Sequence, residues 1–112
     1  MADTLFQKII KREIPGKIEF EDDNYIVLHD IQPQAPVHLL VIPKKPIPTL
    51  NDIRPEDHEL IGGLFTTASK VMSNLGYKDY RAVMNCGAGA QQSVFHLHLH
   101  LLAGRGFTWP PG

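Results

Sequence analysis

The stretch of sequence that decides the fold is SVFHLHLHLL, residues Ser93–Leu102. From Phe95 onward, apolar and polar side chains alternate, which predicts a strand because successive strand residues point to opposite faces. Phe95, Leu97, Leu99 and Leu101 would share one face, and His96, His98 and His100 would share the other. A helix would give the three histidines no common face. We expect a helix to cover the apolar face, and the histidine face to look into a cleft or an interface.

Three interpretations of the histidine row are open. It could be the polar face of a half-exposed strand. It could bind a metal, but same-face neighbours lie about 6.5–7 Å apart along a strand, so all three could share one zinc ion only if the strand were distorted. The lone Cys86 belongs to no C-x-x-C pair that would support a metal site. Third, the row could act on a phosphate, because neutral imidazole is a nucleophile near neutral pH and its neighbours can donate hydrogen bonds to phosphate oxygens.

Length and charge limit the functional classes. A chain of 112 residues predicts one domain, residues 1–112. Eleven basic and twelve acidic residues give a net charge of −1, which argues against a nucleic-acid partner. A single cysteine excludes an internal disulfide and favours a reducing compartment, so we expect a cytoplasmic protein. We expect no membrane partner, because no apolar run approaches the roughly 18–20 residues of a membrane span.

The remaining elements follow from hydrophobic periodicity and turn residues. Helical spacing of apolar residues predicts a short helix over residues 4–12 and one long helix over 55–75, which we place on the apolar face of the histidine strand. Strands are expected at 18–21, 25–30, 37–42, 80–85 and 95–102. The fold class is therefore α+β, a five-stranded antiparallel sheet with two helices. The pair Gly62-Gly63 inside the long helix suggests only close packing.

Other polar residues have two possible roles each. Asp30 ends the second strand, where a carboxylate often caps a turn. A lone histidine such as His38 in an apolar strand is usually a satisfied core residue. The small residues that follow Asn85 could form a plain loop, or could let backbone amides approach a phosphate.

Several motifs resemble one known family. The pattern His96-x-His98-x-His100 followed by two leucines resembles the signature of the histidine triad family of nucleotide hydrolases and transferases. A second block supports it, running from Asp30 through His38 to Lys45. The ending Trp-Pro-Pro-Gly, residues 109–112, resembles the Hint branch, the purine nucleoside phosphoramidases. The resemblance extends over essentially the whole chain.

The resemblance implies a reaction and its residues. It implies hydrolysis of purine nucleoside phosphoramidates or aminoacyl-type adenylates to the nucleoside monophosphate, with His98 forming a covalent nucleotidyl intermediate. His100 and Ser93 would stabilise the phosphate oxygens, and His38 and His96 would set ring orientation and tautomer. Neither a metal nor a cofactor is expected. A dinucleoside polyphosphate hydrolase of the Fhit type and a nucleotide-binding regulatory module are the alternatives.

The resemblance also implies binding residues and partners. The expected ligand is a purine nucleotide, AMP or GMP, with Asp30 accepting hydrogen bonds from the ribose hydroxyls. Gln91 stands where the family usually has glycine. A homodimer with a continuous ten-stranded sheet is expected, with the C-terminal tail docked near the partner's site. The expected nucleotide-binding residues are Asp30, Ile31, Asn85, Gln91, Gln92 and Ser93, with Phe6, Ile9 and Ile14 forming an apolar pocket for the base.

Overall fold

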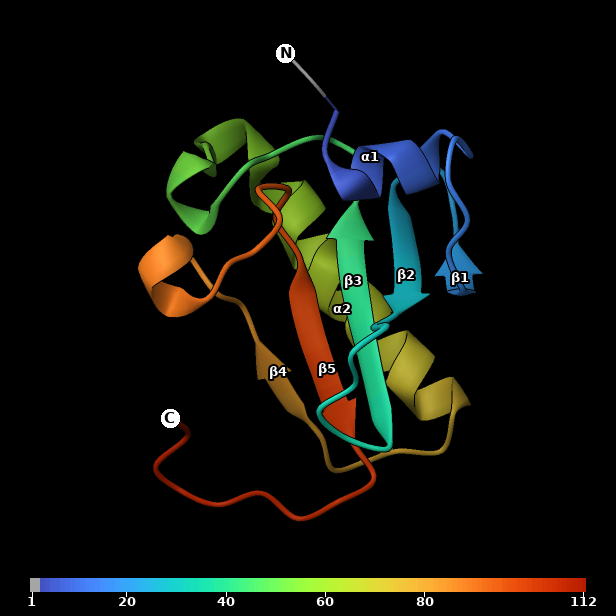
Figure 1. Ribbon diagram of the computed structural model, residues 1–112, viewed down its shortest axis with the longest axis vertical. Coiled ribbons are helices and arrows are strands. Elements are labelled where there is room, and N and C mark those ends of the chain that lie inside the picture. Colours follow the sequence, from blue (N-terminus) through green and yellow to red (C-terminus); the bar gives the residue numbers. More distant parts are fainter. Residues whose placement is uncertain (1–2) are drawn as a thin grey trace.

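The computed structural model describes residues 3–112 and contains one five-stranded sheet. Its strand order is β1-β2-β3-β5-β4, and every neighbouring pair is antiparallel (Figure 1). With two α-helices this confirms the predicted α+β class. The strands are β1 Ile18–Glu21, β2 Tyr25–His29, β3 Val37–Pro43, β4 Arg81–Val83 and β5 Leu99–Ala103. The helices are α1 Leu5–Ile10 and α2 His58–Asn74, with single 3₁₀ turns at Leu50–Asp52, Pro55–Asp57 and Ala88–Ala90.

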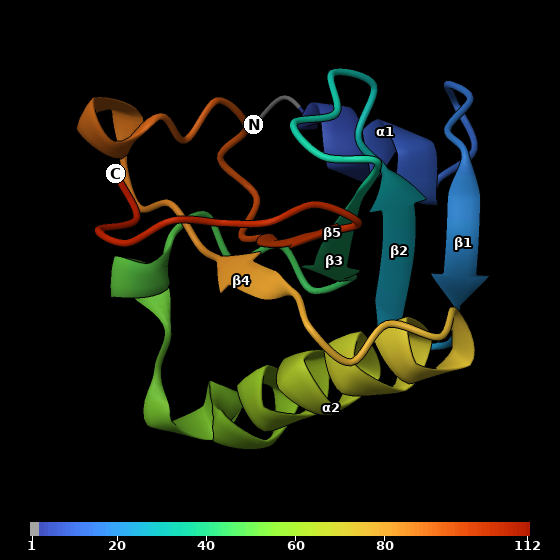
Figure 2. The same cartoon turned by 90° about the horizontal axis from the view of Figure 1, so that it is seen from below.

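A helix covers each face of the sheet (Figure 2). Helix α2 packs its buried stripe against the face that carries Leu97, Leu99 and Leu101, as predicted. The shorter helix α1 lies on the opposite face, where Phe6 and Ile9 close a second apolar cluster with residues of β2 and β3. The central strand β3 is therefore apolar on both sides, as expected for a strand buried between two layers. None of the helices within residues 3–112 is long and apolar enough to cross a membrane.

The histidine strand is shorter than predicted, because β5 begins at Leu99 and not at Phe95. Strand β3 pairs Val41 with Leu99, so continuing the ladder would place Pro43 opposite Leu97. Pro43 has no N–H to donate, and its carbonyl accepts from the His96 ring instead. Phe95 is 47% exposed and does not join the buried face. The prediction that one regular strand displays all three histidines was therefore wrong.

Other helices and strands are also shorter than predicted, for reasons local to each end. Helix α1 is capped by Thr4, whose side chain accepts from the Gln7 N–H, and it stops at Ile10 before Arg12 takes a left-handed φ of 62°. The predicted start of the long helix at Pro55 is a 3₁₀ turn, after which α2 proper begins. Gly76, with φ 87°, follows the end of α2, as the sequence indicated. Strand β4 covers three of the six residues expected.

The structure explains one glycine of the Gly62-Gly63 pair. A Cβ on Gly63 would clash with the Tyr25 hydroxyl, which donates a hydrogen bond to the Leu60 carbonyl, whereas a Cβ on Gly62 would meet nothing within 4 Å. Gly63→Ala should therefore destabilise the protein by about 1–3 kcal/mol through overpacking. Gly62→Ala is the matched control and should stabilise it by up to about 1 kcal/mol through helix propensity. Urea unfolding measures both, and equal effects of the two variants would contradict this packing argument.

Candidate active site on the histidine face

His98 occupies the centre of the candidate site, and a backbone carbonyl fixes its tautomer. Its Nδ1 lies 2.8 Å from the His96 carbonyl oxygen, which can only accept, so Nδ1 carries the proton. The neutral ring therefore keeps its lone pair on Nε2. The ring is buried, lines the cleft, and packs edge-on against Phe6 with ring centroids 5.0 Å apart. His98 thus presents an unprotonated, oriented imidazole nitrogen, which is what a nucleophile requires.

His38 and His100 form a hydrogen-bonded pair beside His98, and the positions of their protons are also fixed. The Gln34 N–H donates to His38 Nδ1 over 3.0 Å, so the neutral His38 ring carries its proton on Nε2. His38 Nε2 lies 2.8 Å from His100 Nδ1 and 3.3 Å from an Asp30 oxygen. His38 therefore donates to His100 Nδ1, which leaves the proton of neutral His100 on Nε2. Where His98 offers a lone pair, His100 offers an N–H donor, and the rings of the two are 5.0 Å apart.

His96 differs from the other two members of the row. Its side chain is fully buried, Nε2 donates to the Pro43 carbonyl over 2.6 Å, and Nδ1 has no hydrogen-bond partner among residues 3–112. The ring does not line the cleft. Its backbone carbonyl orients His98, so the orienting role implied by the family resemblance is carried by the main chain of His96 and not by its imidazole.

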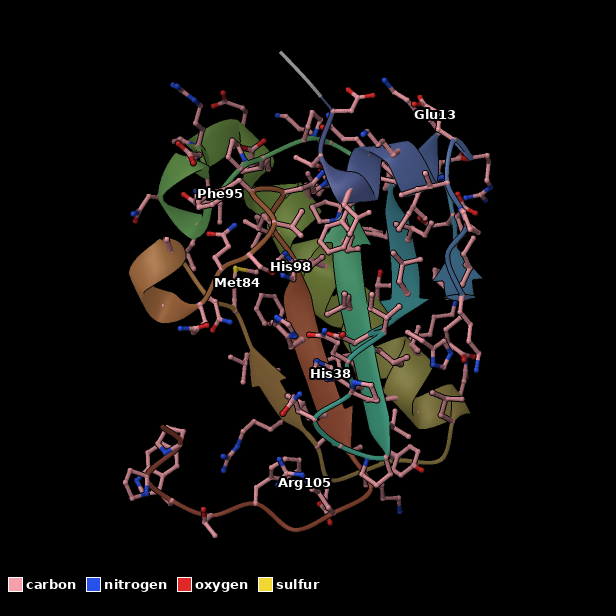
Figure 3. All side chains as sticks on the ribbon, viewed as in Figure 1. Glu13, His38, Met84, Phe95, His98 and Arg105 are labelled. Atoms are coloured by element: carbon pink, nitrogen blue, oxygen red, sulfur yellow. The ribbon has the colours of Figure 1, made fainter. Side chains whose placement is uncertain are left out.

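The histidine face opens into a cleft of about 330 Å³, which is lined by α1, the end of β2, the middle of β3, β5 and the segment before β5. Figure 3 shows the His98 and His38 side chains on this side of the sheet. Its lining combines apolar side chains with polar ones. Of the predicted residues, the lining includes Phe6, Ile9, Asp30, Ile31, Ser93, His98 and His100. It also includes residues that the sequence did not single out: Leu5, Pro15, Gly16, Lys17, Leu28, His29, Gln32, Leu40 and Val94. Strand alternation could have found Leu28 and Leu40, but no local signal marked Lys17.

Other predicted binding residues lie elsewhere. Ile14 lines an adjoining hollow that shares Ile9, Pro15 and Gly16 with the cleft. Asn85 and Gln91 do not line the cleft. Gln91 does take a left-handed φ of 70°, the conformation for which glycine is favoured, which explains why the family usually has glycine there.

Gln92, another predicted binding residue, does not line the cleft. It is buried, and its side-chain amide accepts from the Gly87 N–H and donates to the carbonyls of Pro48 and Val94. Its backbone N–H donates to the Gly87 carbonyl. Its donors bind carbonyls within the loop and the Pro48 carbonyl after β3, so Gln92 holds the shape of the segment that leads to Ser93 and ties it to the chain after β3.

One group of possible metal-binding atoms exists within the described residues. The ligand atoms of Asp30, His38 and His100 lie within 4.8 Å of one another. The hydrogen bond between His38 and His100 already uses one nitrogen of each ring. A metal ion there would have to break this bond and displace its proton, so the donor set fits a hydrogen-bonded network better than a metal centre.

Burial sets the charge state of the four site histidines. It lowers the pKa of His38, His96 and His98 below the ordinary value, although Asp30 partly opposes this at His38 and His98. Burial, together with the neighbouring imidazoles of His98 and His38, lowers the pKa of His100 to about 4. All four rings are thus neutral at pH 7, as the tautomers assigned above require.

These lowered pKa values predict acid destabilisation. The unfolded chain takes up protons on histidine below about pH 6.5, while the folded chain resists protonation down to its lower pKa values. Stability should therefore be full above pH 6.5 and fall as the pH falls toward 4, by about 1.4 kcal/mol for each unit of pKa shift. Urea unfolding across this range measures the slope. His100→Gln should flatten it, and a stability that does not change over this range would contradict the burial argument.

Comparisons with known proteins agree with this geometry. The family model described as "Scavenger mRNA decapping enzyme C-term binding" matches residues 3–106. A HIT-like protein of Synechocystis is 56% identical over 98% of this chain and 97% of its own length. A crystal structure of a HIT family hydrolase from Legionella pneumophila superposes with a TM-score of 0.94 at 48% identity, covering 98% of this chain and all of that one. A histidine triad nucleotide-binding protein from Candida albicans gives a TM-score of 0.75 at 31% identity, covering 98% and 85%.

The family model and these relatives match the chain over nearly its full length, and the sheet with its histidine network agrees with them. The chain therefore belongs to the histidine triad family.

Proposed function

We propose that this protein hydrolyses purine nucleoside phosphoramidates or aminoacyl-type adenylates, releasing the nucleoside monophosphate through a nucleotidyl–His98 intermediate. The observation that carries the proposal is the hydrogen bond from His98 Nδ1 to the His96 carbonyl, because it leaves Nε2 as the free nucleophilic nitrogen in the cleft. The names of a Legionella relative, a HIT family hydrolase, and of a Candida relative, a nucleotide-binding protein, support the same class of ligand and reaction.

The reaction proceeds in two displacements. His98 Nε2 attacks phosphorus, a P–N bond to Nε2 forms, and the bond to the leaving nitrogen or acyl oxygen breaks with its electron pair. His100 also lines the cleft, and its Nε2–H can donate a hydrogen bond to a phosphoryl oxygen, while an amine leaving group takes its proton from solvent water. Water then attacks phosphorus and loses a proton to solvent, the bond from phosphorus to His98 Nε2 breaks with its electron pair returning to Nε2, and the monophosphate is released. Splitting one displacement into two lowers each barrier.

Groups around the two histidines suit a nucleotide. Ser93 lines the cleft and its hydroxyl can donate to a phosphate oxygen, which adds a donor where charge develops. Asp30 also lines the cleft, with one oxygen held by the Gln32 N–H at 2.8 Å, and its remaining lone pairs can accept from ribose hydroxyls. Phe6 and Ile9 form the apolar wall on which a purine can stack.

A substrate panel tests the proposal. Adenosine and guanosine phosphoramidates, an aminoacyl adenylate and a diadenosine polyphosphate are incubated with the protein, and AMP or GMP release is followed by chromatography. We expect the phosphoramidates and the aminoacyl adenylate to give the highest kcat/KM. Preferred cleavage of the dinucleotide would replace the proposal with a Fhit-type hydrolase. AMP binding without turnover of any substrate would replace it with a nucleotide-binding module.

We also propose that two copies join through their β4 strands into a ten-stranded sheet, in a cytoplasmic homodimer. Strand β4 is an edge of the sheet, and an edge strand offers unpaired backbone groups to a partner. Trp109, in the tail expected to dock on the partner, is 82% exposed in the single chain. The single cysteine is consistent with a reducing compartment. Sedimentation should give twice the mass of one chain, and a monomer at every concentration would contradict the dimer.

A further inference from the structure

The segment after β5 is tied to the loop that precedes β3. Arg105 donates from Nε to the Gln34 carbonyl over 3.0 Å, and its guanidinium lies 4.3 Å above the Phe107 ring. A Cβ on Gly104, where φ is 91°, would lie 2.9 Å from the Pro36 side chain, so the two segments touch closely. Figure 3 shows Arg105 and His38 toward the same end of the sheet. Arg105 therefore links the C-terminal segment to a loop whose other contacts reach the candidate active site.

The loop residue that Arg105 holds also determines the protonation pattern of the site. The Gln34 carbonyl accepts from Arg105, while the N–H of the same residue donates to His38 Nδ1. With that donor in place, His38 must keep its proton on Nε2, and His100 must keep its own on Nε2. Without it, His38 could carry its proton on Nδ1 and accept from His100 through Nε2. His100 would then lose the Nε2–H that faces the substrate.

We propose that Arg105 is a positioning residue, which holds Gln34 so that its backbone N–H fixes the tautomers of His38 and His100. Arg105 does not line the cleft, and its hydrogen bonds go to the carbonyls of Gln34 and Gly106 and not to a site histidine. Its effect passes through the main chain of Gln34. The consequence for turnover rests on the function proposed above, whereas the consequence for the tautomers does not.

A matched control lies on the other side of the same aromatic ring. The Arg81 guanidinium is 5.0 Å from the Phe107 ring, and it donates to the Thr108 carbonyl. Arg81 thus contacts the same tail segment from β4, but it has no hydrogen bond to the loop before β3. Loss of Arg81 removes a tail contact and keeps the Arg105–Gln34 hydrogen bond.

The experiment compares Arg105→Met, Arg105→Lys and Arg81→Met with the wild type. Methionine keeps an apolar stem over Phe107 without a donor, and lysine restores a donor for the Gln34 carbonyl. The first readout is the ¹⁵N shifts of the ring nitrogens of His38 and His100 in the ligand-free protein at neutral pH. We expect Arg105→Met to raise the fraction of His38 protonated on Nδ1, and Arg105→Lys to restore part of the wild-type pattern. Arg81→Met should leave the pattern unchanged.

The second readout is steady-state hydrolysis of an adenosine phosphoramidate. Arg105→Met should lower kcat by about tenfold, the usual scale for a group that orients a site residue, with little change in KM. Unchanged ring shifts in a folded Arg105→Met variant would overturn the inference. Equal shifts in Arg81→Met and Arg105→Met would also overturn it, because the tail and not the loop would then be responsible. If the wild type hydrolyses nothing, the proposed function fails, and the ring shifts still decide this inference.

Discussion

Replacing His98 with alanine should lower kcat for an adenosine phosphoramidate by roughly 10⁴-fold or more, the scale seen when a covalent nucleophile is removed. The reason is structural: His98 is the ring whose tautomer leaves an unprotonated Nε2 at the cleft, and His100 presents a protonated nitrogen that cannot replace it. The cleft walls that would hold the base and ribose remain, so AMP should still bind. Steady-state kinetics and calorimetric titration with AMP measure the two effects separately.

Two variants make this result interpretable. His58 begins α2, is exposed and does not line the cleft, so His58→Ala should keep activity close to that of the wild type. His98 is buried against Phe6, so alanine there leaves a cavity, and His98→Asn keeps more of the volume while still lacking a basic nitrogen. Retention of activity within tenfold in a folded His98→Asn protein would rule out His98 as the nucleophile.

Leu101→Ala should destabilise the fold by about 2–5 kcal/mol, the usual cost of truncating a buried leucine. Leu101 is fully buried, belongs to the core cluster under α2, and pairs with Leu39 on one side and Ala82 on the other. The strand that it occupies carries His100, so loosening it also disturbs the site. Urea unfolding at neutral pH gives the loss in unfolding free energy.

Phe95→Ala is the control for the same stretch of sequence. Phenylalanine is larger than leucine, and alternation alone would place Phe95 on the same buried face as Leu101. Because Phe95 is 47% exposed, its truncation should cost only about 0.5 kcal/mol or less. If Phe95→Ala cost as much as Leu101→Ala, the shortened β5 strand would be contradicted.

Much of the architecture was predictable because hydrophobic periodicity is a local property. Alternation in residues 95–102 placed Leu97, Leu99 and Leu101 on a buried face, and helical spacing predicted the helix that covers it. The two-sided apolar pattern of residues 37–42 correctly predicted a central strand. The family resemblance added the site residues, of which Asp30, Ser93, His98 and His100 do line one cleft.

What could not be predicted depends on contacts between distant residues. Where β5 begins is decided by Pro43, which is 54 positions before Leu97 and ends the ladder on the opposite strand. His96 looks like His98 and His100 in the sequence, but its ring donates a hydrogen bond to the Pro43 carbonyl and lies in the core. Gln92 looks like a ligand donor, but three backbone groups satisfy its side-chain amide. The tautomer of His38 depends on a backbone N–H, which no side-chain motif reveals.

The most direct test of the nucleotidyl–His98 proposal is the intact mass of the protein, quenched soon after mixing with an adenosine phosphoramidate. We expect a transient population heavier by one adenylyl group, mapped by peptide fragmentation to His98, that decays as AMP appears. His98→Asn should show no such species. Wild-type protein that releases AMP at full rate without any adduct, or with an adduct on a different residue, would contradict the account.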